Sequence, residues 1–437
     1  PTRRSSDLGQ NQIVSDVIAD QTGSGGTGAN AGSWGLAKTG TGTLTLTAAN
    51  TYSGGTTVNG GLINFNAASN FGSGSITLNG GGLQWASGNT ADISGKLNAI
   101  GSGGTTLDYN GNAVTLATAL TGTGGVTVAN SGSGGALTLT TTESYFGATT
   151  INSGATLALS GVGSISNSSV VTVNGTFDIS ASSAFLNRIT TLAGAGSVVL
   201  GSKVLAVTGG STEFSGAING AGAGGLEIAG GTQTLSGVNG YVGFTQIDAG
   251  ATLALKGNGS IANSSGIAFA SGAGVGTFDI SQTNSGASVA GLNDTVGGSV
   301  VSLGAKTLTI TGNRGPYDGV IQDGGIGGGT GGNVTIASGG LATFGGVNTY
   351  TGLTTISGGG QLDLTSGGSI ASSKAVINDG TFDISRAGGG VSINSLSGTS
   401  IFGAVNLGAN TLTFTNANGT FAGTIRDGGR SEEHTSE

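Results

Sequence analysis

Two acidic residues that could act together are Asp363 and Asp383, which lie 20 residues apart in the sequence, with Arg386 nearby. If the chain advances by one coil of a β-solenoid over that distance, the two carboxylates stack about 5 Å apart on neighbouring coils. A pair at that separation suits a retaining glycosidase or a calcium site. The place of Asp363 is taken by Ala158 and Ala254 in earlier parts of the chain, so the pair is not a feature of the repeat.

Three further aspartates recur in the block Thr-Phe-Asp-Ile-Ser, at Asp178, Asp279 and Asp383. Their separation of about a hundred residues corresponds to four or five coils, roughly 20–24 Å, whereas paired catalytic carboxylates need about 5–9.5 Å. These aspartates cannot act together. We therefore interpret them as outward, solvated strand residues, and the first copy has Gln84 instead of the acid.

Asp20, Asp323 and Asp427 each lie two residues after an Ile in a Gly-rich corner, where Asx turns explain them without a ligand. The run Gly103–Asp108 lacks the middle glycine of the calcium-binding nonapeptide. We therefore predict no catalytic, cofactor-binding or metal-binding residues, and no cofactor.

The composition excludes several kinds of chemistry. The chain of 437 residues contains no Cys, and its only histidine is His434, close to the end. Without a histidine in the body, a Ser-His-Asp triad and Cys/His metal sites are ruled out there. The net charge of −8 gives nucleic-acid binding no electrostatic basis.

The first and last eight residues differ in composition from the rest. Residues 1–8 read PTRRSSDL and residues 430–437 read RSEEHTSE, and both resemble translated sequencing adapters. We expect them to be non-native tails, with the natural chain continuing in both directions from a single solenoid body at 9–429.

Repeated strands organise this body. Four similar segments begin near residues 35, 134, 224 and 339, and their aligned aromatics are Tyr52, Tyr145, Tyr241 and Tyr350. Within them apolar residues alternate with Thr or Ala, as in Thr43–Thr47, and Gly or Asn separates the short strands. Alternation with period two predicts half-buried strands, and 93 glycines supply tight corners. The sequence therefore predicts an all-β, right-handed parallel β-helix of about 17–21 coils with negligible helix.

The segment from Gly35 to Asn66 reads GLAKTGTGTLTLTAANTYSGGTTVNGGLINFN. It resembles the autotransporter-associated β-strand repeat of type V secreted passengers, also called the passenger-associated transport repeat. The copies from Gly224 and Gly339 keep the core N-x-Y-x-G-x-T, whereas the copy from Gly134 has Glu143 in place of Asn. The resemblance implies export to the surface of a Gram-negative bacterium and anchoring through an outer-membrane β-barrel outside this sequence.

From these features we expect a non-enzymatic passenger fragment that acts as a structural stalk or adhesin, with repeats that assist translocation and folding. The expected partners are the barrel and either a second copy of the chain or host or cell-surface glycans, and not nucleic acid. The alternative is a β-helix polysaccharide lyase or glycoside hydrolase, which would gather acids and a base on adjacent coils. Here only Asp363 and Asp383 approach that arrangement.

Overall fold

The fold is a parallel β-solenoid of about 19 turns with 2% helix, as the sequence predicts. The computed structural model describes residues 2–4, 10–21 and 32–427. These residues fall into two compact units, 1–205 and 206–437. The tail at 430–437 lies outside the described residues, as does most of the tail at 1–8 apart from the strand β1. Both tails and the single body at 9–429 stay predictions.

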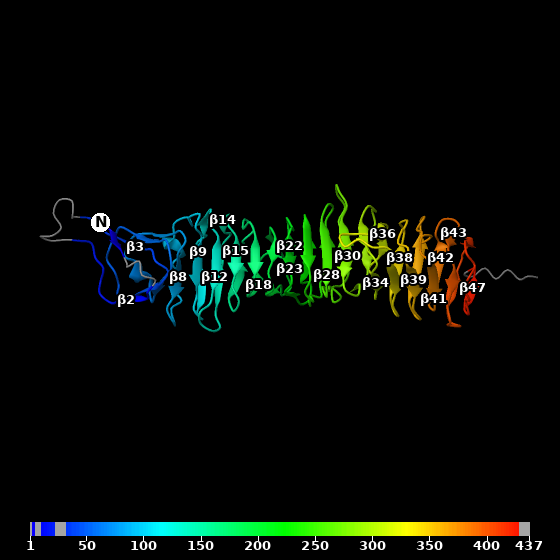
Figure 1. Cartoon of the computed structure of the whole chain (residues 1–437), viewed down its shortest axis with the longest axis horizontal. Coiled ribbons are helices and arrows are strands. Elements are labelled where there is room, and N and C mark those ends of the chain that lie inside the picture. The colour runs from blue at the N-terminus through cyan, green and yellow to red at the C-terminus, as the bar shows by residue number, and fades with distance from the viewer. Residues whose placement is uncertain (1, 5–9, 22–31, 428–437) are drawn as a thin grey trace, which may run out of the picture. The chain divides into compact units, whose positions relative to one another are not determined.

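The first unit stacks its strands coil upon coil in parallel (Figure 1). Among its described residues, two short 3-10 helices, η2 (Ala68–Phe71) and η3 (Ser94–Lys96), interrupt the strands. The strands are β1 (Thr2–Arg4), β2 (Gln12–Val14), β3 (Gly35–Lys38), β4 (Thr43–Leu46), β5 (Thr56–Val58), β6 (Leu62–Phe65), β7 (Ile76–Leu78), β8 (Gly82–Trp85), β9 (Thr105–Asp108), β10 (Ala113–Leu116), β11 (Thr121–Gly122), β12 (Val126–Ala129), β13 (Ala136–Leu139), β14 (Ser144–Tyr145), β15 (Thr149–Ile151), β16 (Thr156–Gly161), β17 (Val171–Val173), β18 (Thr176–Ser182), β19 (Leu186–Ile189), β20 (Leu192–Ala193) and β21 (Ser197–Val199).

The second unit repeats this arrangement, and its main stacks run β23-β26-β28-β30-β33-β36, β31-β34-β37-β39-β41-β44 and β35-β38-β40-β42-β45-β47. The strand β22 (Val204–Val207) contains the division between the units. The others are β23 (Glu213–Phe214), β24 (Ala217–Asn219), β25 (Gly225–Ile228), β26 (Thr232–Leu235), β27 (Thr245–Ile247), β28 (Thr252–Gly257), β29 (Ile267–Phe269), β30 (Thr277–Thr283), β31 (Ala287–Val289), β32 (Leu292–Asn293), β33 (Val300–Ser302), β34 (Thr307–Ile310), β35 (Pro316–Tyr317), β36 (Val320–Gln322), β37 (Asn333–Ile336), β38 (Leu341–Phe344), β39 (Leu353–Ile356), β40 (Gln361–Thr365), β41 (Ala375–Asn378), β42 (Thr381–Arg386), β43 (Val391–Ile393), β44 (Leu396–Ser397), β45 (Ala404–Asn406), β46 (Leu412–Phe414) and β47 (Thr424–Arg426).

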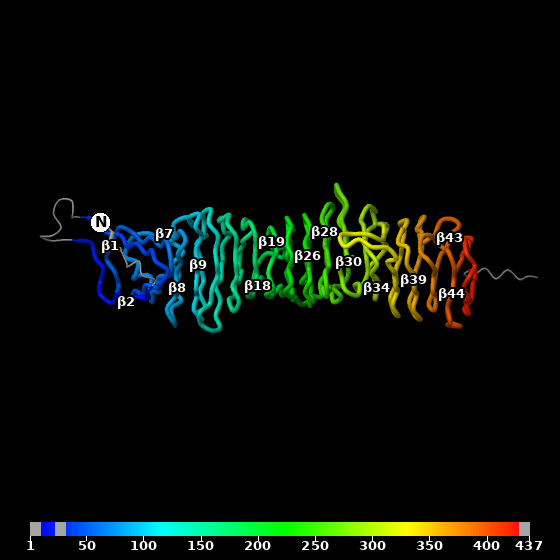
Figure 2. Tube along the Cα trace, viewed as in Figure 1, coloured from blue at the N-terminus to red at the C-terminus, as the bar shows by residue number. Residues whose placement is uncertain are grey.

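The register of the strands sets the length of a coil. In the first unit Leu137 is opposite Leu157, Leu157 is opposite Phe177, and Phe177 is opposite Val198. The chain therefore returns to the same place after steps of 20, 20 and 21 residues. Figure 2 shows this regular succession of coils within each unit as a gradual change of colour.

The alternation seen in the sequence places one face of each strand in the core. Leu157, Leu159, Phe177 and Ile179 are at most 2% exposed, while the residues between them are half-buried. Burying a Leu or Phe side chain contributes roughly 1.5–3 kcal/mol, so every coil stabilises its neighbours through these apolar rows. The opposite face carries the Thr and Asp side chains that are candidates for function.

Candidate functional site

The acidic pair lies on neighbouring strands of the second unit. The strands β40 and β42 run parallel, and Asp363 is opposite Asp383 in their register. The prediction that these residues stack on adjacent coils is confirmed. Both side chains belong to the outer face of the sheet, because Leu362 and Phe382 beside them are fully buried.

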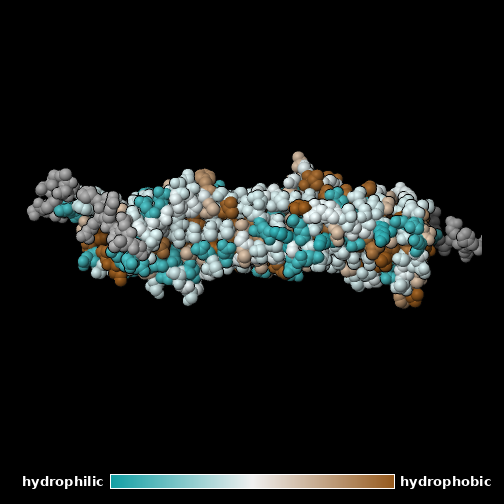
Figure 3. Space-filling view, viewed as in Figure 1, coloured by the Kyte–Doolittle hydropathy of each residue, from teal (hydrophilic) through white to brown (hydrophobic). Residues whose placement is uncertain are grey.

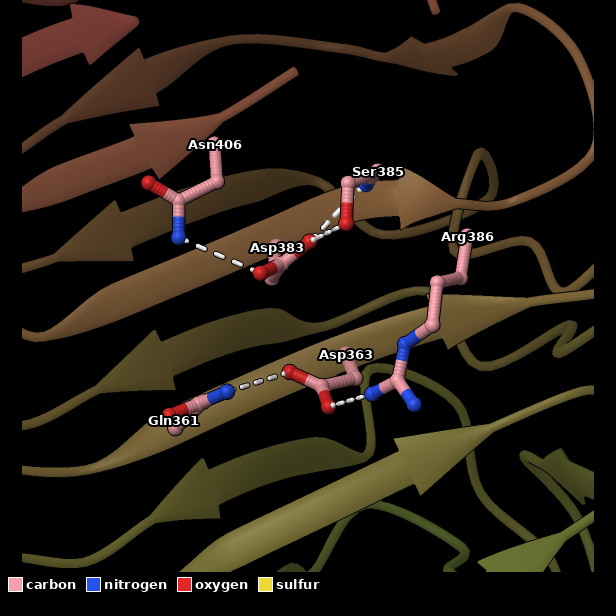
Figure 4. A network of polar contacts seen from close by, with 6 residues as sticks. All are labelled: Gln361, Asp363, Asp383, Ser385, Arg386 and Asn406. Carbon is pink, nitrogen blue, oxygen red and sulfur yellow. Dashed lines mark hydrogen bonds and ion pairs between the residues drawn. The ribbon is translucent and has the colours of Figure 1, made fainter. Parts of the chain in front are cut away.

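Asp363 is held by an amide and a guanidinium (Figure 4). Its Oδ1 accepts a hydrogen bond from Gln361 Nε2 at 2.8 Å, and its Oδ2 forms an ion pair with Arg386 Nη2 at 2.5 Å. The Asp363 side chain is 3% exposed, but that of Arg386 is 64% exposed. Arg386 therefore neutralises a buried carboxylate and still presents part of its guanidinium to solvent.

A one-residue irregularity in the strand pairing brings Arg386 to this position. The register shifts between Asp363 and Thr365, so that Thr365 is opposite Arg386. A β-bulge changes the direction of the side chains that follow it. Arg386 can therefore reach back from β42 to the carboxylate on the preceding coil.

Asp383 is an ionised hydrogen-bond acceptor. It accepts the backbone N–H and the hydroxyl of Ser385 at 2.8 and 2.6 Å, and Asn406 Nδ2 at 3.1 Å (Figure 4). Burial raises the pKa of Asp383, but these hydrogen bonds and the charge of Arg386 outweigh it and hold the pKa below its ordinary value. A glycosidase acid needs a raised pKa, so this environment does not favour acid catalysis by Asp383.

The aspartates of the Thr-Phe-Asp-Ile-Ser block share one local structural role. In each copy Oδ1 accepts the backbone N–H of the serine two residues later, beside a shift in strand register. This bond satisfies an N–H group that the irregular ladder leaves free. The pairs are Asp178 with Ser180 at 2.8 Å, Asp279 with Ser281 at 2.9 Å, and Asp383 with Ser385 at 2.8 Å.

The interpretation of these aspartates as solvated is wrong for Asp279, which is 2% exposed. Its Oδ2 accepts the N–H of Ile326 at 2.7 Å, and Ser281 Oγ accepts that of Gly327 at 2.7 Å. A loop from a later coil, which contains Ile326 and Gly327, therefore covers Asp279 and Ser281. Asp178 and Asp383 are half-buried, and Asp383 lies in a different sheet from Asp279. Asp279 and Asp383 are therefore not brought together.

Asp20 and Asp323 hold loops to later coils. The two oxygens of Asp323 accept N–H groups of Gly331 and Gly332 and the hydroxyl of Thr351 at 3.1, 2.9 and 2.6 Å. These partners lie at least eight residues downstream, so the Asx-turn interpretation of Asp323 is wrong. Asp20 likewise accepts Ser53 Oγ at 2.7 Å, and this bond is the main cause that lowers its pKa.

The repeats also contain buried hydroxyl pairs. In every copy the tyrosine hydroxyl bonds to the threonine hydroxyl four residues later, and the tyrosine is at most 1% exposed. Burial raises the pKa of each tyrosine. The sequence alignment identified these tyrosines but not their hydrogen-bond partner, although the fixed Tyr-x-x-x-Thr spacing signals it. The pairs are Tyr52 with Thr56, Tyr145 with Thr149, Tyr241 with Thr245 and Tyr350 with Thr354, at 2.6, 2.6, 2.8 and 2.6 Å.

The asparagine two residues before the tyrosine connects neighbouring coils. Asn239 Oδ1 accepts the N–H of Ile218 at 3.0 Å, and its Nδ2 donates to the carbonyl of Ser260 at 3.0 Å. Asn348 bonds in the same way to Ile321 and Ser369, at 2.9 and 3.1 Å. The asparagine of the repeat motif Asn-x-Tyr thus forms a buried polar connection between three coils.

Glu143 replaces this asparagine in the second copy and is 1% exposed. It accepts the N–H of Leu120 and the hydroxyl of Thr141, the latter at 3.0 Å. Burial raises the pKa of Glu143 to about 7, even though both hydrogen bonds oppose the rise. The carboxyl group therefore changes charge close to neutral pH inside the core.

Within residues 2–4, 10–21 and 32–427 no group of three or more His, Cys, Asp or Glu side chains could hold a metal ion. Over the same described residues, no helix has the length and apolarity to cross a membrane.

The strand register and the recurring buried polar bonds together define a parallel β-solenoid built from repeats. The family of passenger-associated-transport-repeat sequences matches residues 36–64, 131–159, 230–255 and 339–364. The resemblance to autotransporter passenger regions is therefore confirmed. Each of the four matches contains the buried tyrosine of its copy, namely Tyr52, Tyr145, Tyr241 or Tyr350.

Among curated proteins, the chain is similar to the adhesin BmaC autotransporter of Brucella suis biovar 1 (strain 1330). The two are 35% identical over 370 residues, which cover 79% of this chain and 10% of the relative. The chain thus spans about a tenth of the length of the curated relative that it matches. No solved structure matches the chain.

Proposed function

We propose that this chain is a segment of an autotransporter passenger that is displayed on the surface of a Gram-negative cell, where it serves as a stalk or adhesin. The observation that carries the proposal is the four-fold passenger-associated repeat built into a parallel β-solenoid. The likeness to an autotransporter adhesin supports the same function. An outer-membrane β-barrel is the partner that such a passenger requires.

The stacked coils also suit export in an extended state. Each coil buries its apolar row on the coil before it, so folding of the emerging chain can proceed one coil at a time. Cysteine is absent from the sequence, so disulfides cannot lock the chain before it is translocated. We propose that the repeats assist translocation through this stepwise stacking.

The outer surface supports a non-enzymatic function. Most of the face seen in Figure 3 is pale, with separate teal and brown patches, which agrees with a coat rich in Thr, Ser and Gly. The acidic pair expected from the sequence consists of Asp363, neutralised by Arg386, and Asp383, whose pKa is lowered. This pair gives little support to the alternative of a β-helix lyase or hydrolase.

The test is display of the chain on a bacterial surface through an outer-membrane β-barrel. Protease treatment of intact cells should digest the displayed chain, and cells should clump or adhere to host-cell monolayers more than cells that display the barrel alone. Display without any clumping or adherence would reduce the function to a passive stalk. Failure of the chain to reach the surface would contradict the passenger assignment.

The enzymatic alternative has its own measurement. The purified chain should release no reducing ends or unsaturated products from polysaccharides. Product formation that is lost in the variant Asp383→Asn would overturn the non-enzymatic proposal.

A further inference from the structure

A groove lies on the outer face of the second unit, beside the buried carboxylate of Asp363. Its volume is about 500 Å³, within the roughly 300–1,000 Å³ typical of small-ligand sites. Side chains from β35, β38, β40 and β42 line it, among them Pro316, Leu341, Asp363 and Arg386. In the register of these strands Pro316 is opposite Thr343, and Thr343 is opposite Asp363, so successive coils form its floor.

Asp318 also lines the groove, and its carboxylate is not engaged. The side chain is half-buried, and among the described residues its carboxylate has no hydrogen-bond or ion-pair partner. Its Oδ1 lies 2.1 Å from the position that a Cβ on Gly345 would occupy, so the glycine leaves room for the carboxylate. A half-buried carboxylate without a protein partner is available to accept hydrogen bonds from a ligand.

The rim of the groove contains an unusual backbone conformation. Ser366 has a φ of +48°, in the left-handed region, and its side chain is exposed at the groove. The equivalent positions in the two preceding copies are Gly161 and Gly257, with φ of +58° and +59°. A non-glycine residue there costs about 1 kcal/mol, and such strain is concentrated at functional sites.

The groove residues depart from the repeat as a group. Asp363 replaces Ala158 and Ala254, and Arg386 takes the place of Ala181 and Gln282. The core-facing residues on the same strands keep the apolar pattern of the other copies. Packing therefore does not require Asp363, Arg386 or a serine at 366, which suggests that these three residues serve another purpose.

We propose that this groove binds a neutral saccharide. Sugar hydroxyls both donate and accept hydrogen bonds, so they match the free carboxylate of Asp318 and the exposed N–H groups of Arg386. Pro316 and Leu341 offer apolar surface to the C–H face of a sugar ring. Two carboxylates and one guanidinium give the groove a net negative charge, which disfavours sulfated polyanions, while Arg386 disfavours a metal cation.

This proposal identifies the class of ligand that the adhesin would bind. It rests on the proposed function only for the assumption that the chain encounters the sugar at the cell surface. Binding by the purified chain tests the groove independently of surface display. A shallow site of this size, without an exposed aromatic platform, should bind with a Kd of the order of 1 mM.

The experiment is saturation-transfer NMR of the full chain with lactose, maltose and cellobiose, and with a heparin disaccharide as the anionic probe. At least one neutral disaccharide should receive saturation, and Asp318→Asn should weaken its binding about tenfold, which corresponds to loss of a charge-assisted hydrogen bond. Asp318 has no protein partner, so this variant should fold as the original chain does. Lys256→Gln, which removes an exposed cation at the place equivalent to Thr365, is the matched control and should bind normally.

Ser366→Gly separates binding from folding. Relief of the left-handed strain should raise the free energy of unfolding, whereas loss of the side chain should weaken sugar binding several-fold. Saturation of no neutral probe, or equal binding by Asp318→Asn, would overturn the saccharide site. Sugar binding by the purified chain without adherence of displaying cells would leave the groove standing and contradict only the adhesin function.

Discussion

The buried hydrogen-bonding residue before the repeat tyrosine differs in one copy, and the difference has chemical consequences. Asn239 and Asn348 each accept one N–H and donate to a carbonyl on the next coil. An ionised Glu143 can only accept, and its charge is buried. Asn50 in the first copy bonds in the same way to Ile18 and Asn70. The same position therefore forms a neutral connection in the first, third and fourth copies and a titratable one in the second.

Glu143→Asn should remove a pH dependence of local stability. The folded-state pKa of about 7 lies above the ordinary value of 4.5, so the contribution of Glu143 is fully present below pH 4.5 and is lost as pH rises through 7. The loss amounts to up to about 3 kcal/mol. Hydrogen exchange of the segment around Leu120 and Tyr145 should therefore be faster at pH 7.5 than at pH 5 in the original chain.

In Glu143→Asn the protection of this segment should be nearly equal at the two pH values, after correction for intrinsic exchange. The coil around Asn348 serves as an internal control in both proteins. A pH dependence that persists unchanged in the variant would show that another group is responsible.

At the scale of the strand and its turn, the coils approach so closely that some turns tolerate only glycine. A Cβ on Gly237 would lie 1.9 Å from the carbonyl oxygen of Gly216 on the preceding coil. This requirement comes from stacking, since the φ of Gly237 is not in the left-handed region. Gly389 has an ordinary φ as well, but no atom lies within 4 Å of its Cβ position.

Gly237→Ala should therefore destabilise the second unit by about 1–3 kcal/mol, because the backbone of two coils must separate. Gly389→Ala should change the free energy of unfolding by less than about 1 kcal/mol and in the stabilising direction. Guanidinium unfolding followed by circular dichroism measures both. Equal midpoints for the two variants would contradict the close-approach argument.

The strands themselves were predictable because alternation with period two is a local property. The interpretation of the 20 residues between Asp363 and Asp383 as one coil is confirmed by their pairing. The burial of Asp279 was not predictable, since it depends on a loop that reaches it through Ile326, 47 residues later in the chain. The ion pair between Arg386 and Asp363 was not predictable either, because the shift in register after Asp363 changes the direction of the Arg386 side chain.

At the scale of the whole molecule, the tyrosines link protonation to folding. All six tyrosines of the chain have raised pKa values, chiefly because they are buried. In an unfolded chain tyrosine titrates near pH 10. The stability that these groups contribute is therefore present below about pH 10 and is lost as pH rises above it.

Phenolate absorbance of the folded chain should remain low as pH passes 10 and then rise together with the loss of the β-sheet circular dichroism signal. The chain in guanidinium is the control, and its tyrosines should titrate near pH 10. Gradual ionisation near pH 10 with an intact circular dichroism spectrum would show that the hydroxyls are accessible to solvent.

The regular length of these coils also has a consequence for the evolution of the gene. Leu137, Leu157 and Phe177 occupy equivalent places at intervals of 20 residues. An in-frame deletion or duplication of one interval would leave each neighbouring strand facing an equivalent partner. Unequal recombination between similar segments can therefore shorten or lengthen the protein in whole coils while its mode of folding is preserved.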